Sequence, residues 1–413
     1  MRPQTFILTM LALVIANASM AVVRYAAPKG TDPEGLSPES PGSLKAMVDT
    51  LKAGDTLYLA DGQYNLKKTL VVNISGKADK WATICPMSGA RPVIDFRKQP
   101  NGTNGIKVSG HFIHIRGITI RYAGKKGIWL ENASHCILEN LDVYGCCDSG
   151  IQLRKGGYNT VVNCDSHDNF DYQDNGVNAD GFADKQGGAP FPGNTYIGCR
   201  AWNNSDDGWD SFQRESKDTP TVYLYCVTYN NGPAHFDLSS HPRANGVDST
   251  LTCMKGKDFA HFPNGGNPNG FKLGGQGKDN KASGNYTRHD TELRHCLAVG
   301  HRKKGFDQNN NAGHMAISHC LAIGNEINYG FGNPFPCTLD ISYCISISPT
   351  SGEHLATAAE TTVTQADNSW NTGWTGNQGF AIPDTPAIVK LLLSPRQPSG
   401  ALPEALLNIL KNL

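Results

Sequence analysis

Four aspartates and one lysine lie in short segments whose residue types could act on an acidic ligand. The segment NADGFADK carries Asp180, and NSDDGWD carries Asp206, Asp207 and Asp210. Carboxylates gathered this closely repel each other unless a cation joins them, and a set of oxygen ligands suits Ca²⁺ better than Mg²⁺. The segment NGFKLGG places Lys272 between two large apolar residues, which is unusual for a lysine that only solvates a surface.

Lys272 is the candidate proton acceptor of this set. A bound dication nearby disfavours the ammonium form and so lowers the pKa of a lysine, and the neutral amine is a capable base. A base beside Ca²⁺ suits removal of the C5 proton of a uronate whose carboxylate is held by the cation, followed by loss of the C4 oxygen. Two plainer interpretations stay open: the aspartates are solvated turn residues, or Lys272 only binds an acidic ligand.

An internal repeat organises the chain around these residues. Segments such as VVNCDSHDN, YIGCRAWNN, YLYCVTYNN and LRHCLAVGH share an apolar alternation and a cysteine, usually with Asn five residues later. The residues at this cysteine position are Ile118, Leu141, Cys164, Cys199, Cys226, Cys296, Cys320 and Cys344. A second motif follows each, a Gly and then an apolar residue, ten residues after the cysteine position in four cases.

This repeat predicts an all-β fold, a right-handed parallel β-helix in which each repeat is one coil. The cysteine position then forms an interior ladder, and Asn169, Asn204, Asn231 and Asn325 form a corner ladder. Because the side chains of a strand alternate between faces, residues beside the buried aromatic of the second motif face outward.

The register of the coils brings the chemical residues into one stripe. Asp180 and Asp207 share a position two residues before the aromatic, and Ala183, Asp210, Lys272 and Asp307 share the position after it. Equivalent residues of neighbouring coils stack about 4.8 Å apart. We therefore expect the aspartates to gather within two coils, with Lys272 one coil further on.

The remaining segments are assigned by composition and pattern. Residues 1–21 form an apolar stretch typical of a secretory signal peptide, so we expect a secreted, extracellular protein. Residues 22–352 form the predicted β-helix domain, with helical periodicity over 41–54 as its N-terminal cap and an insertion at about 232–268 that could wall a groove. Residues 353–413 lose the repeat and are expected to pack along the coil or cap its other end.

Charge and cysteine content limit the partners. The chain has 37 basic and 37 acidic residues, which argues against bulk electrostatic binding of nucleic acid, and no other stretch is long enough to span a membrane. We expect a monomer. Export would permit disulfides. The cysteines outside the ladder are the disulfide candidates Cys85, Cys136, Cys146, Cys147, Cys253 and Cys337.

The motifs together resemble the family nine polysaccharide lyases, pectate lyases built as a ten-coil parallel β-helix. The resemblance covers nearly the whole chain after residue 21, and its central motifs are NADGFADK, NNSDDGWDSF, NGFKLGG and KKGFDQNNN. It implies that Asp180, Asp206, Asp207 and Asp210 bind Ca²⁺ and that Lys272 is the base. It also implies that the substrate is the acidic polysaccharide polygalacturonate, cleaved by β-elimination to 4,5-unsaturated oligogalacturonides.

Further charged residues could line the groove and bind substrate. They are Lys185, Lys217, Arg302, Lys303, Lys304 and Asp307. Two other functions compete with the lyase interpretation. One is a polygalacturonase-type glycoside hydrolase that uses paired aspartates and water. The other is a non-catalytic β-helical carbohydrate-binding protein, which the fold alone does not exclude.

Overall fold

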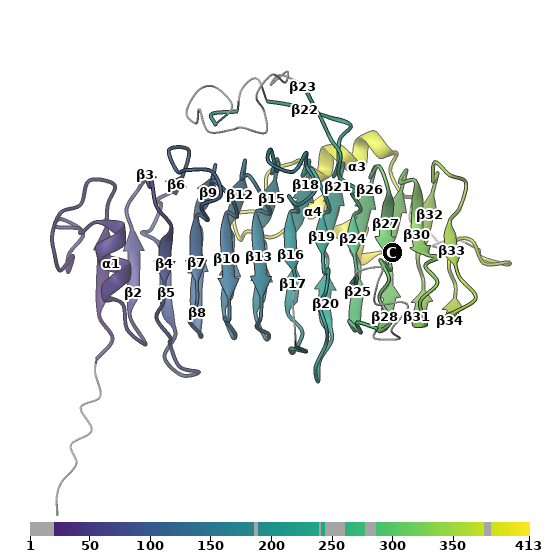
Figure 1. The fold of residues 1–413 in the computed structure, drawn as a ribbon, viewed down its shortest axis with the longest axis horizontal. Helices are drawn as coiled ribbons and strands as arrows, with labels where there is room; N and C mark the ends of the chain where they lie inside the picture. Colours follow the sequence, from purple (N-terminus) through teal and green to yellow (C-terminus); the bar gives the residue numbers. More distant parts are fainter. Residues whose placement is uncertain (1–19, 186–188, 239–240, 244–260, 277–285, 376–380) are drawn as a thin grey trace, which may run out of the picture.

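Three long parallel sheets wind into a β-helix, which confirms the fold class predicted from the repeat (Figure 1). The computed structural model describes residues 20–185, 189–238, 241–243, 261–276, 286–375 and 381–413. The predicted signal peptide thus lies almost entirely outside the described residues. Within these ranges, no helix combines the length and the apolar character needed to cross a membrane.

Each full coil contributes one strand to each sheet, and sheet I has one further strand at either end. Sheet I contains β1 (Val23–Ala26), β2 (Thr56–Leu59), β5 (Ala82–Pro86), β8 (Ile113–Arg116), β11 (Ile137–Glu139), β14 (Thr160–Val162), β17 (Thr195–Ile197), β20 (Thr221–Leu224), β25 (Thr291–Arg294), β28 (His314–Ser318), β31 (Cys337–Ser342) and β34 (Thr361–Ala366). Sheet II contains β4 (Leu70–Val72), β7 (Ile106–Val108), β10 (Ile128–Glu131), β13 (Ile151–Arg154), β16 (Phe182–Asp184), β19 (Trp209–Asp210), β24 (Phe271–Lys272), β27 (Lys304–Asp307), β30 (Ile327–Phe331) and β33 (Leu355–Thr357). Sheet III contains β3 (Gly62–Asn65), β6 (Pro92–Asp95), β9 (Thr119–Arg121), β12 (Asp142–Tyr144), β15 (Asp165–His167), β18 (Arg200–Trp202), β21 (Val227–Tyr229), β26 (Leu297–Val299), β29 (Leu321–Ile323) and β32 (Ile345–Ile347).

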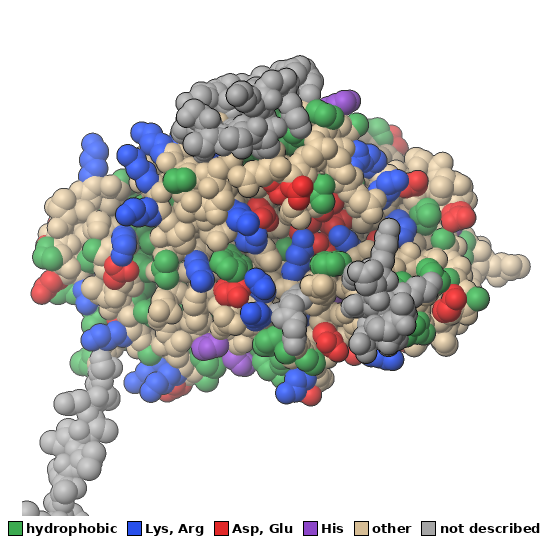
Figure 2. Space-filling view, in the orientation of Figure 1, with side chains coloured by type: hydrophobic (Ala, Val, Ile, Leu, Met, Phe, Trp, Pro, Cys, Tyr) green, Lys and Arg blue, Asp and Glu red, His purple; other side chains and the backbone are tan. Residues whose placement is uncertain are grey.

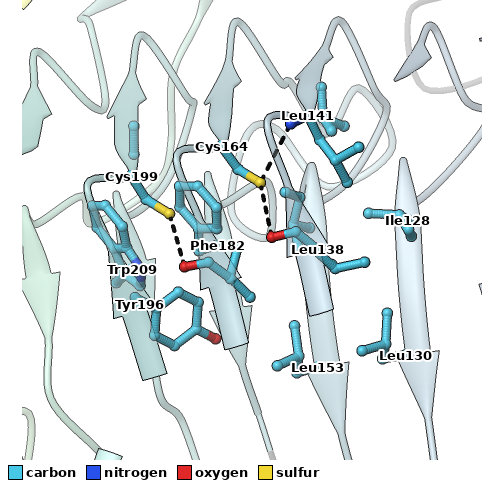
Figure 3. Close-up of a cluster of buried hydrophobic side chains, with 14 of the residues drawn as sticks. Ile128, Leu130, Leu138, Leu141, Leu153, Cys164, Phe182, Tyr196, Cys199 and Trp209 are labelled. Carbon is cyan, nitrogen blue, oxygen red and sulfur yellow. Dashed lines mark hydrogen bonds between the residues drawn. The ribbon is translucent and has the colours of Figure 1, made fainter. Parts of the chain in front are cut away.

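The cysteine position forms a buried ladder at the turn from sheet I to sheet III, as the repeat predicts. The thiols contact backbone groups of neighbouring coils: the Cys164 thiol lies 3.5 Å from the Leu138 carbonyl, and the Cys199 thiol lies 3.3 Å from the Val161 carbonyl (Figure 3). All eleven described cysteines are buried free thiols. The disulfide prediction is therefore wrong for the described members of the candidate set, while Cys253 lies outside the described residues.

The predicted asparagine ladder is also present, and its amides bond along the stack. The Asn169 amide donates to Asn204 Oδ1 at 2.8 Å, and the Asn204 amide donates to Asn231 Oδ1 at 2.9 Å. His301 fills this position in the next coil, where its Nδ1 accepts from the Asn231 backbone N–H at 3.2 Å. The ladder continues to Asn325, whose Oδ1 accepts from the His301 N–H at 2.9 Å. Each buried amide is thereby satisfied by the coils above and below it.

The interior face of sheet II changes from aliphatic to aromatic along the axis. Ile128 and Ile151 of one pair of coils are followed in register by Phe182, Trp209 and Phe271. Figure 3 shows Ile128, Phe182 and Trp209 of this row. The ring centroids of Phe182 and Trp209 lie 4.6 Å apart, and those of Trp209 and Phe271 lie 4.8 Å apart. These rings fix the height and register of the strands that carry the stripe of charged residues.

The stack continues through Phe306 to Tyr329, whose rings are 5.0 Å apart. The sequence motif YGFGN suggests Phe331 as the equivalent aromatic, but the register pairs Phe306 with Tyr329. In the coil after residue 324, the chain enters sheet II earlier than the spacing of the other coils predicts. The motif alone therefore selects Phe331, which lies two residues after the true equivalent, Tyr329.

Helices cover the N-terminal end and one side of the coil. The segment predicted as a helical cap contains α1 (Leu44–Thr50), which buries Leu44, Met47 and Val48 and begins at the N-cap Ser43. The coil itself extends beyond residue 352, because β33 and β34 join sheets II and I. The helices α3 (Thr385–Leu392) and α4 (Glu404–Lys411) then pack along the side of the solenoid (Figure 1). Their apolar residues share one buried cluster with residues of sheet III such as Val227 and Leu297.

The described part of the insertion at 232–268 leaves the coil and lies at its edge (Figure 1). It contains the antiparallel strands β22 (His235–Asp237) and β23 (His261–Pro263). Phe236 and Phe262 pack against Phe170, so the insertion contacts the loop between β15 and β16.

We expect Asn204→Ala to lower the unfolding free energy by about 2 kcal/mol, because the buried amide of Asn169 loses its 2.8 Å acceptor and keeps only the 3.3 Å contact with Ser166 Oγ. Thermal and urea unfolding midpoints followed by circular dichroism would measure this loss. Glu360→Ala, at an exposed position, is the matched control. Equal midpoints for the two variants would contradict a stabilising role for the ladder.

Candidate active site

The outward positions of sheet II form one continuous row, which we call the floor row. Strand pairing places these residues in register: Val71, Lys107, Trp129, Gln152, Ala183, Asp210, Lys272, Asp307, Gly330 and Ala356. The predicted sharing of one position by Ala183, Asp210, Lys272 and Asp307 is therefore observed. Asp210 and Lys272 are neighbours on adjacent coils because their strands pair directly.

A second row lies two residues before the interior residue of each strand of sheet II and is held by a hydrogen-bond ladder. It contains Ser149, Asp180, Asp207, Asn269 and Lys304. Asp180 Oδ1 accepts from the Asp207 backbone N–H at 3.3 Å, and Asp207 Oδ1 accepts from the Asn269 N–H at 2.7 Å. One oxygen of each carboxylate is thus fixed by the next coil, while the Oδ2 atoms of Asp180 and Asp207 contact other side chains.

The glycine between these two rows is required by close contact of the coils. A Cβ atom on Gly208 would lie 2.2 Å from Thr228 Oγ1 and 2.6 Å from the Gly270 carbonyl oxygen. Only glycine lets the chain turn at this point without pushing the coils apart. This explains why Gly precedes the aromatic in the sequence motif.

Three of the four predicted aspartates converge. One carboxylate oxygen each from Asp180, Asp207 and Asp210 lies within 4.8 Å of the others, and all three residues are buried. Oxygens that ligate one Ca²⁺ at about 2.3–2.6 Å lie within about 5 Å of one another, so the donor set fits a hard dication. Asp206 is buried beside them but does not belong to this group of three.

Two lysines form ion pairs with the acidic group, one from the coil before Asp210 and one from the coil after it. Lys272 Nζ lies 2.9 Å from Asp207 Oδ2 and 3.4 Å from Asp210 Oδ1. Lys185 Nζ lies 2.6 Å from Asp210 Oδ2 and 3.0 Å from Asp180 Oδ2. Figure 2 shows acidic and basic side chains side by side near the middle of the visible face, whereas the three aspartates themselves are buried beneath the surface.

Burial and charge set the protonation of this group. Burial raises the pKa of Asp180 to about 6 and that of Asp207 to about 7. Burial acts in the same direction on Asp210, but the ammonium groups of Lys185 and Lys272 outweigh it and lower the pKa of that carboxyl. Burial opposes the charged form of Lys272, yet the carboxylates of Asp207 and Asp210 raise its pKa well above the usual value.

The direction of the Lys272 pKa depends on what neutralises the carboxylates. The fall predicted from the sequence applies to a lysine beside a bound dication, whereas ion pairs with aspartates stabilise the ammonium. A cation that takes up the three carboxylates would remove these ion pairs and add a positive neighbour. Both changes favour the neutral amine of Lys272.

A cavity of about 500 Å³ adjoins the acidic group on the side of the earlier coils. Lys185 lines it together with Lys125, Lys126, Gln152 and Asn178, and its acidic side chains are Asp148, Asp171 and Asp174. The loop that provides Asp171 and Asn178 also carries Phe170, on which the insertion packs. The insertion therefore supports one wall of the cavity.

The other predicted groove residues lie in different environments. Lys304 pairs with Asp307 at 2.7 Å, and these two continue the rows of the site one coil beyond Lys272. The Arg302 guanidinium donates to the Asn264 carbonyl at 3.0 Å and so holds the insertion. Lys303 pairs with Glu326 at 3.1 Å. Lys217 is exposed in the segment between β19 and β20, and among the described residues it forms no ion pair with the acidic group.

Ser149 and Asn269 are site residues that the sequence analysis missed. The Ser149 hydroxyl donates to Asp180 Oδ2 at 2.9 Å, and the Asn269 side-chain amide donates to Asp207 Oδ1 at 2.8 Å. Both occupy the position two residues before the interior residue of sheet II in their coil, Ile151 for Ser149 and Phe271 for Asn269. Extending the alignment of Asp180 and Asp207 by one coil in each direction would have found them.

Comparison with known proteins agrees with this geometry. A family model described as "Pel9A-like, right handed beta helix region" matches residues 24–334. "Pectate lyase L" of Dickeya dadantii (strain 3937) is 32% identical over 398 residues, which cover 92% of this chain and 82% of that protein. The crystal structure of pectate lyase Pel9A is 29% identical, covers 94% of this chain and 88% of its own, and superposes with a TM-score of 0.72. A rhamnogalacturonan lyase at 22% identity also superposes with a TM-score of 0.72 and shows the shared fold.

The fold and the charged groove define a right-handed β-helix enzyme of the lyase class, because the relatives that match most of the chain are pectate lyases. The chain belongs to the Pel9A-like β-helix family. The resemblance recognised from the central motifs is thereby confirmed.

We expect the affinity of the acidic group for Ca²⁺ to fall as the pH decreases from about 7 to about 6. Protons compete with the cation for Asp180 and Asp207, whose pKa values are raised to about 6 and about 7. Below these pKa values, each proton that the cation must displace lowers its affinity roughly tenfold for every unit by which the pH falls. Calorimetric titration with Ca²⁺ at several pH values, with Asp180→Asn as a weakened reference, would check this. Affinity independent of pH would contradict it.

Proposed function

We propose that this protein is a calcium-dependent pectate lyase that cleaves polygalacturonate by β-elimination. The observation that carries the proposal is the contact between Lys272 and the carboxylates of Asp207 and Asp210, which places a candidate base directly beside a group of oxygens that fits a dication. The relatives support the same substrate, since the alignment with "Pectate lyase L" extends over most of both chains.

Asp180, Asp207 and Asp210 would hold the Ca²⁺, and Asp206 completes the ligand set that the family resemblance implies. The bound cation would neutralise the carboxylate of a uronate in the groove and so make its C5 proton more acidic. The groove offers an acidic polymer both this site and the ammonium groups of Lys185 and Lys304 as binding partners.

Lys272 would accept the C5 proton at Nζ. As the C5–H bond breaks, a C4=C5 double bond forms and the bond from C4 to the glycosidic oxygen breaks. That oxygen takes up a proton from solvent, and Lys272 later returns the C5 proton to solvent, so the step is balanced. The products are one chain with a new reducing end and one 4,5-unsaturated chain. Lys272 is well held for this role, because its strand pairs on both sides and its neighbour Phe271 belongs to the aromatic stack.

The protein would act outside the cell as a monomer. The apolar segment within residues 1–21 supports export by a signal peptide, and pectin is an extracellular polymer in this scheme. N-terminal sequencing of the exported protein would test the cleavage after Ala21 or nearby. A mature protein that retains Met1 would contradict it.

We expect ultraviolet absorbance from unsaturated uronate to rise when the protein acts on polygalacturonate with Ca²⁺. The rise should stop when a chelator is added. The new double bond conjugates with the carboxylate and therefore absorbs in the ultraviolet. New reducing ends without absorbance would instead indicate hydrolysis. The absence of any product would favour a different uronate polymer or a carbohydrate-binding protein.

We expect Lys272→Ala to lower kcat by about 10²–10⁴-fold, the usual contribution of a general base. Binding of polygalacturonate should persist, since the cation and the other groove residues remain. Circular dichroism would show that the variant is folded, and Lys67→Gln, at an exposed position, is the control. Turnover close to that of the unsubstituted enzyme would rule out Lys272 as the base.

A further inference from the structure

Asp55 is a buried aspartate at the N-terminal end of the coil whose carboxylate has no cationic partner. It directly precedes β2 and is only 3% exposed. Its Oδ1 accepts from the Val22 backbone N–H at 2.8 Å, and its Oδ2 accepts from the Lys52 backbone N–H at 2.9 Å. The described residues provide no ion pair for it. Because an aspartate is rarely buried unless its charge is paired, this environment indicates a missing positive group.

The charged side chains nearby do not supply this positive group. The side chain of Lys52 is exposed and forms no ion pair with Asp55 among the described residues. Asp79 and Lys80 are also exposed, and together with Ala21 they contribute to the lining of a cavity of about 250 Å³. The lining thus contains one charge of each sign, so the carboxylate of Asp55 is the charge that remains to be balanced.

The nitrogen that donates to Asp55 follows directly on the predicted signal peptide. Small residues at the third and at the last position before the cleaved bond are typical of a signal peptidase site. The bond after Ala18, with Ala16, satisfies this rule. The bond after Ala21, with Ser19, satisfies it equally. The sequence alone therefore does not choose between the two bonds.

Cleavage after Ala21 would turn the amide nitrogen of Val22 into a terminal amino group. Water is the co-reactant: the bond from the Ala21 carbonyl carbon to the Val22 nitrogen breaks, the hydroxyl group joins that carbon, and the nitrogen takes the hydrogen. At neutral pH the amino group binds a further proton and becomes an ammonium. This ammonium would lie where the Val22 N–H lies now, 2.8 Å from Asp55 Oδ1. Cleavage after Ala18 would leave an amide at this point and Asp55 unpaired.

The surroundings of Val22 suit an ammonium. Its nitrogen is held in place without the preceding residue, because the Val22 carbonyl accepts from the Thr56 N–H at 3.0 Å. An ammonium has three donors, of which Asp55 takes one. Ala21 contributes to the lining of the 250 Å³ cavity, so its removal opens this cavity toward the new terminus and lets water reach the other two.

We propose that the export peptidase cleaves the bond between Ala21 and Val22, and that the new terminal ammonium forms an ion pair with Asp55. This inference rests on the proposed export of the protein and not on its lyase chemistry. Asp55 joins the segment after α1, through Lys52, to sheet I, where its carbonyl accepts from the Thr83 N–H at 2.9 Å. The ion pair would therefore stabilise the N-terminal end of the coil only after the chain has been processed.

Two measurements test this inference. N-terminal sequencing of the exported protein identifies the cleaved bond. Hydrogen exchange followed by mass spectrometry then compares purified full-length forms that begin at Val22 and at Ser19, and the peptide that contains Thr56 reports on the bond to the Val22 carbonyl. Each form is also made with Asp55→Asn. The matched control is Asp79→Asn, which removes an exposed carboxylate from the lining of the neighbouring cavity.

We expect the exported protein to begin at Val22. The Thr56 N–H should exchange about tenfold more slowly in the Val22 form than in the Ser19 form, as gain of one charge-assisted hydrogen bond implies. Asp55→Asn should remove this difference, and Asp79→Asn should preserve it. An exported protein that begins at Ser19 would overturn the assigned bond. Equal exchange in the two forms would overturn the ion pair.

These outcomes are distinct from failure of the earlier proposals. If the protein keeps Met1, the proposed export and the assigned bond are both wrong, and the two purified forms still decide the ion pair. If the protein begins at Val22 but releases no unsaturated uronate, only the lyase assignment fails.

Acetylation of the terminus replaces Asp55→Asn should that variant fail to fold, because it removes the charge of Val22 without changing the core. The acetylated Val22 form should exchange as fast as the Ser19 form. Exchange as slow as that of the free terminus would overturn the ion pair.

Discussion

The stacking of coils in register is the constraint on which the whole structure depends. Each coil repeats the positions of the coil before it, so any side chain has an equivalent neighbour about 4.8 Å away along the axis. Inside, this rule produces the cysteine ladder, the asparagine ladder and the aromatic row from Phe182 to Tyr329. Outside, the same rule forces charges that are distant in sequence into one small volume.

The acidic group is held together by hydrogen bonds between coils and by positive charge on either side of it. Asp180 and Asp207 are fixed by backbone N–H groups of the next coil, and Lys185 and Lys272 supply positive charge from either side. Three carboxylates face two ammonium groups, and burial leaves these charges little solvent to screen them. Such a group responds strongly to a divalent ion, because one dication carries the charge of both lysines.

The repeat made a large part of the site predictable. Because a Gly and an aromatic mark the same position in each coil, Asp180, Asp207, Asp210 and Lys272 could be aligned from the sequence, and the strand register confirms that alignment. Asp206 follows the family motif, but its side chain lies outside the group of three, since adjacent residues of an extended segment point in different directions. The contact of Lys185 with Asp210 was not predictable, because it crosses between coils after the strand has ended.

Irregular segments limited the prediction elsewhere. The loop between β15 and β16 and the insertion that packs on it follow no period, so the cavity beside the acidic group has no signature in the sequence. The helices α3 and α4 bury apolar residues against sheet III, and their amphipathic pattern does not reveal which side of the coil they cover. Tyr329 was misaligned for a related reason, because the length of its coil differs from the others.

The floor row presents side chains at a regular spacing along the axis of the coil. It offers one side chain per coil, from Lys107 and Trp129 at one end through Lys272 to Asp307, at a constant interval set by the backbone rather than by the side chains. A linear polymer that lies on the floor row would therefore be contacted at intervals of one coil. The repeat length of the polymer then decides which of its units contact which coil. Preference for one polymer over another can then arise from a mismatch of two periods that accumulates along the groove, without any single residue that recognises the sugar.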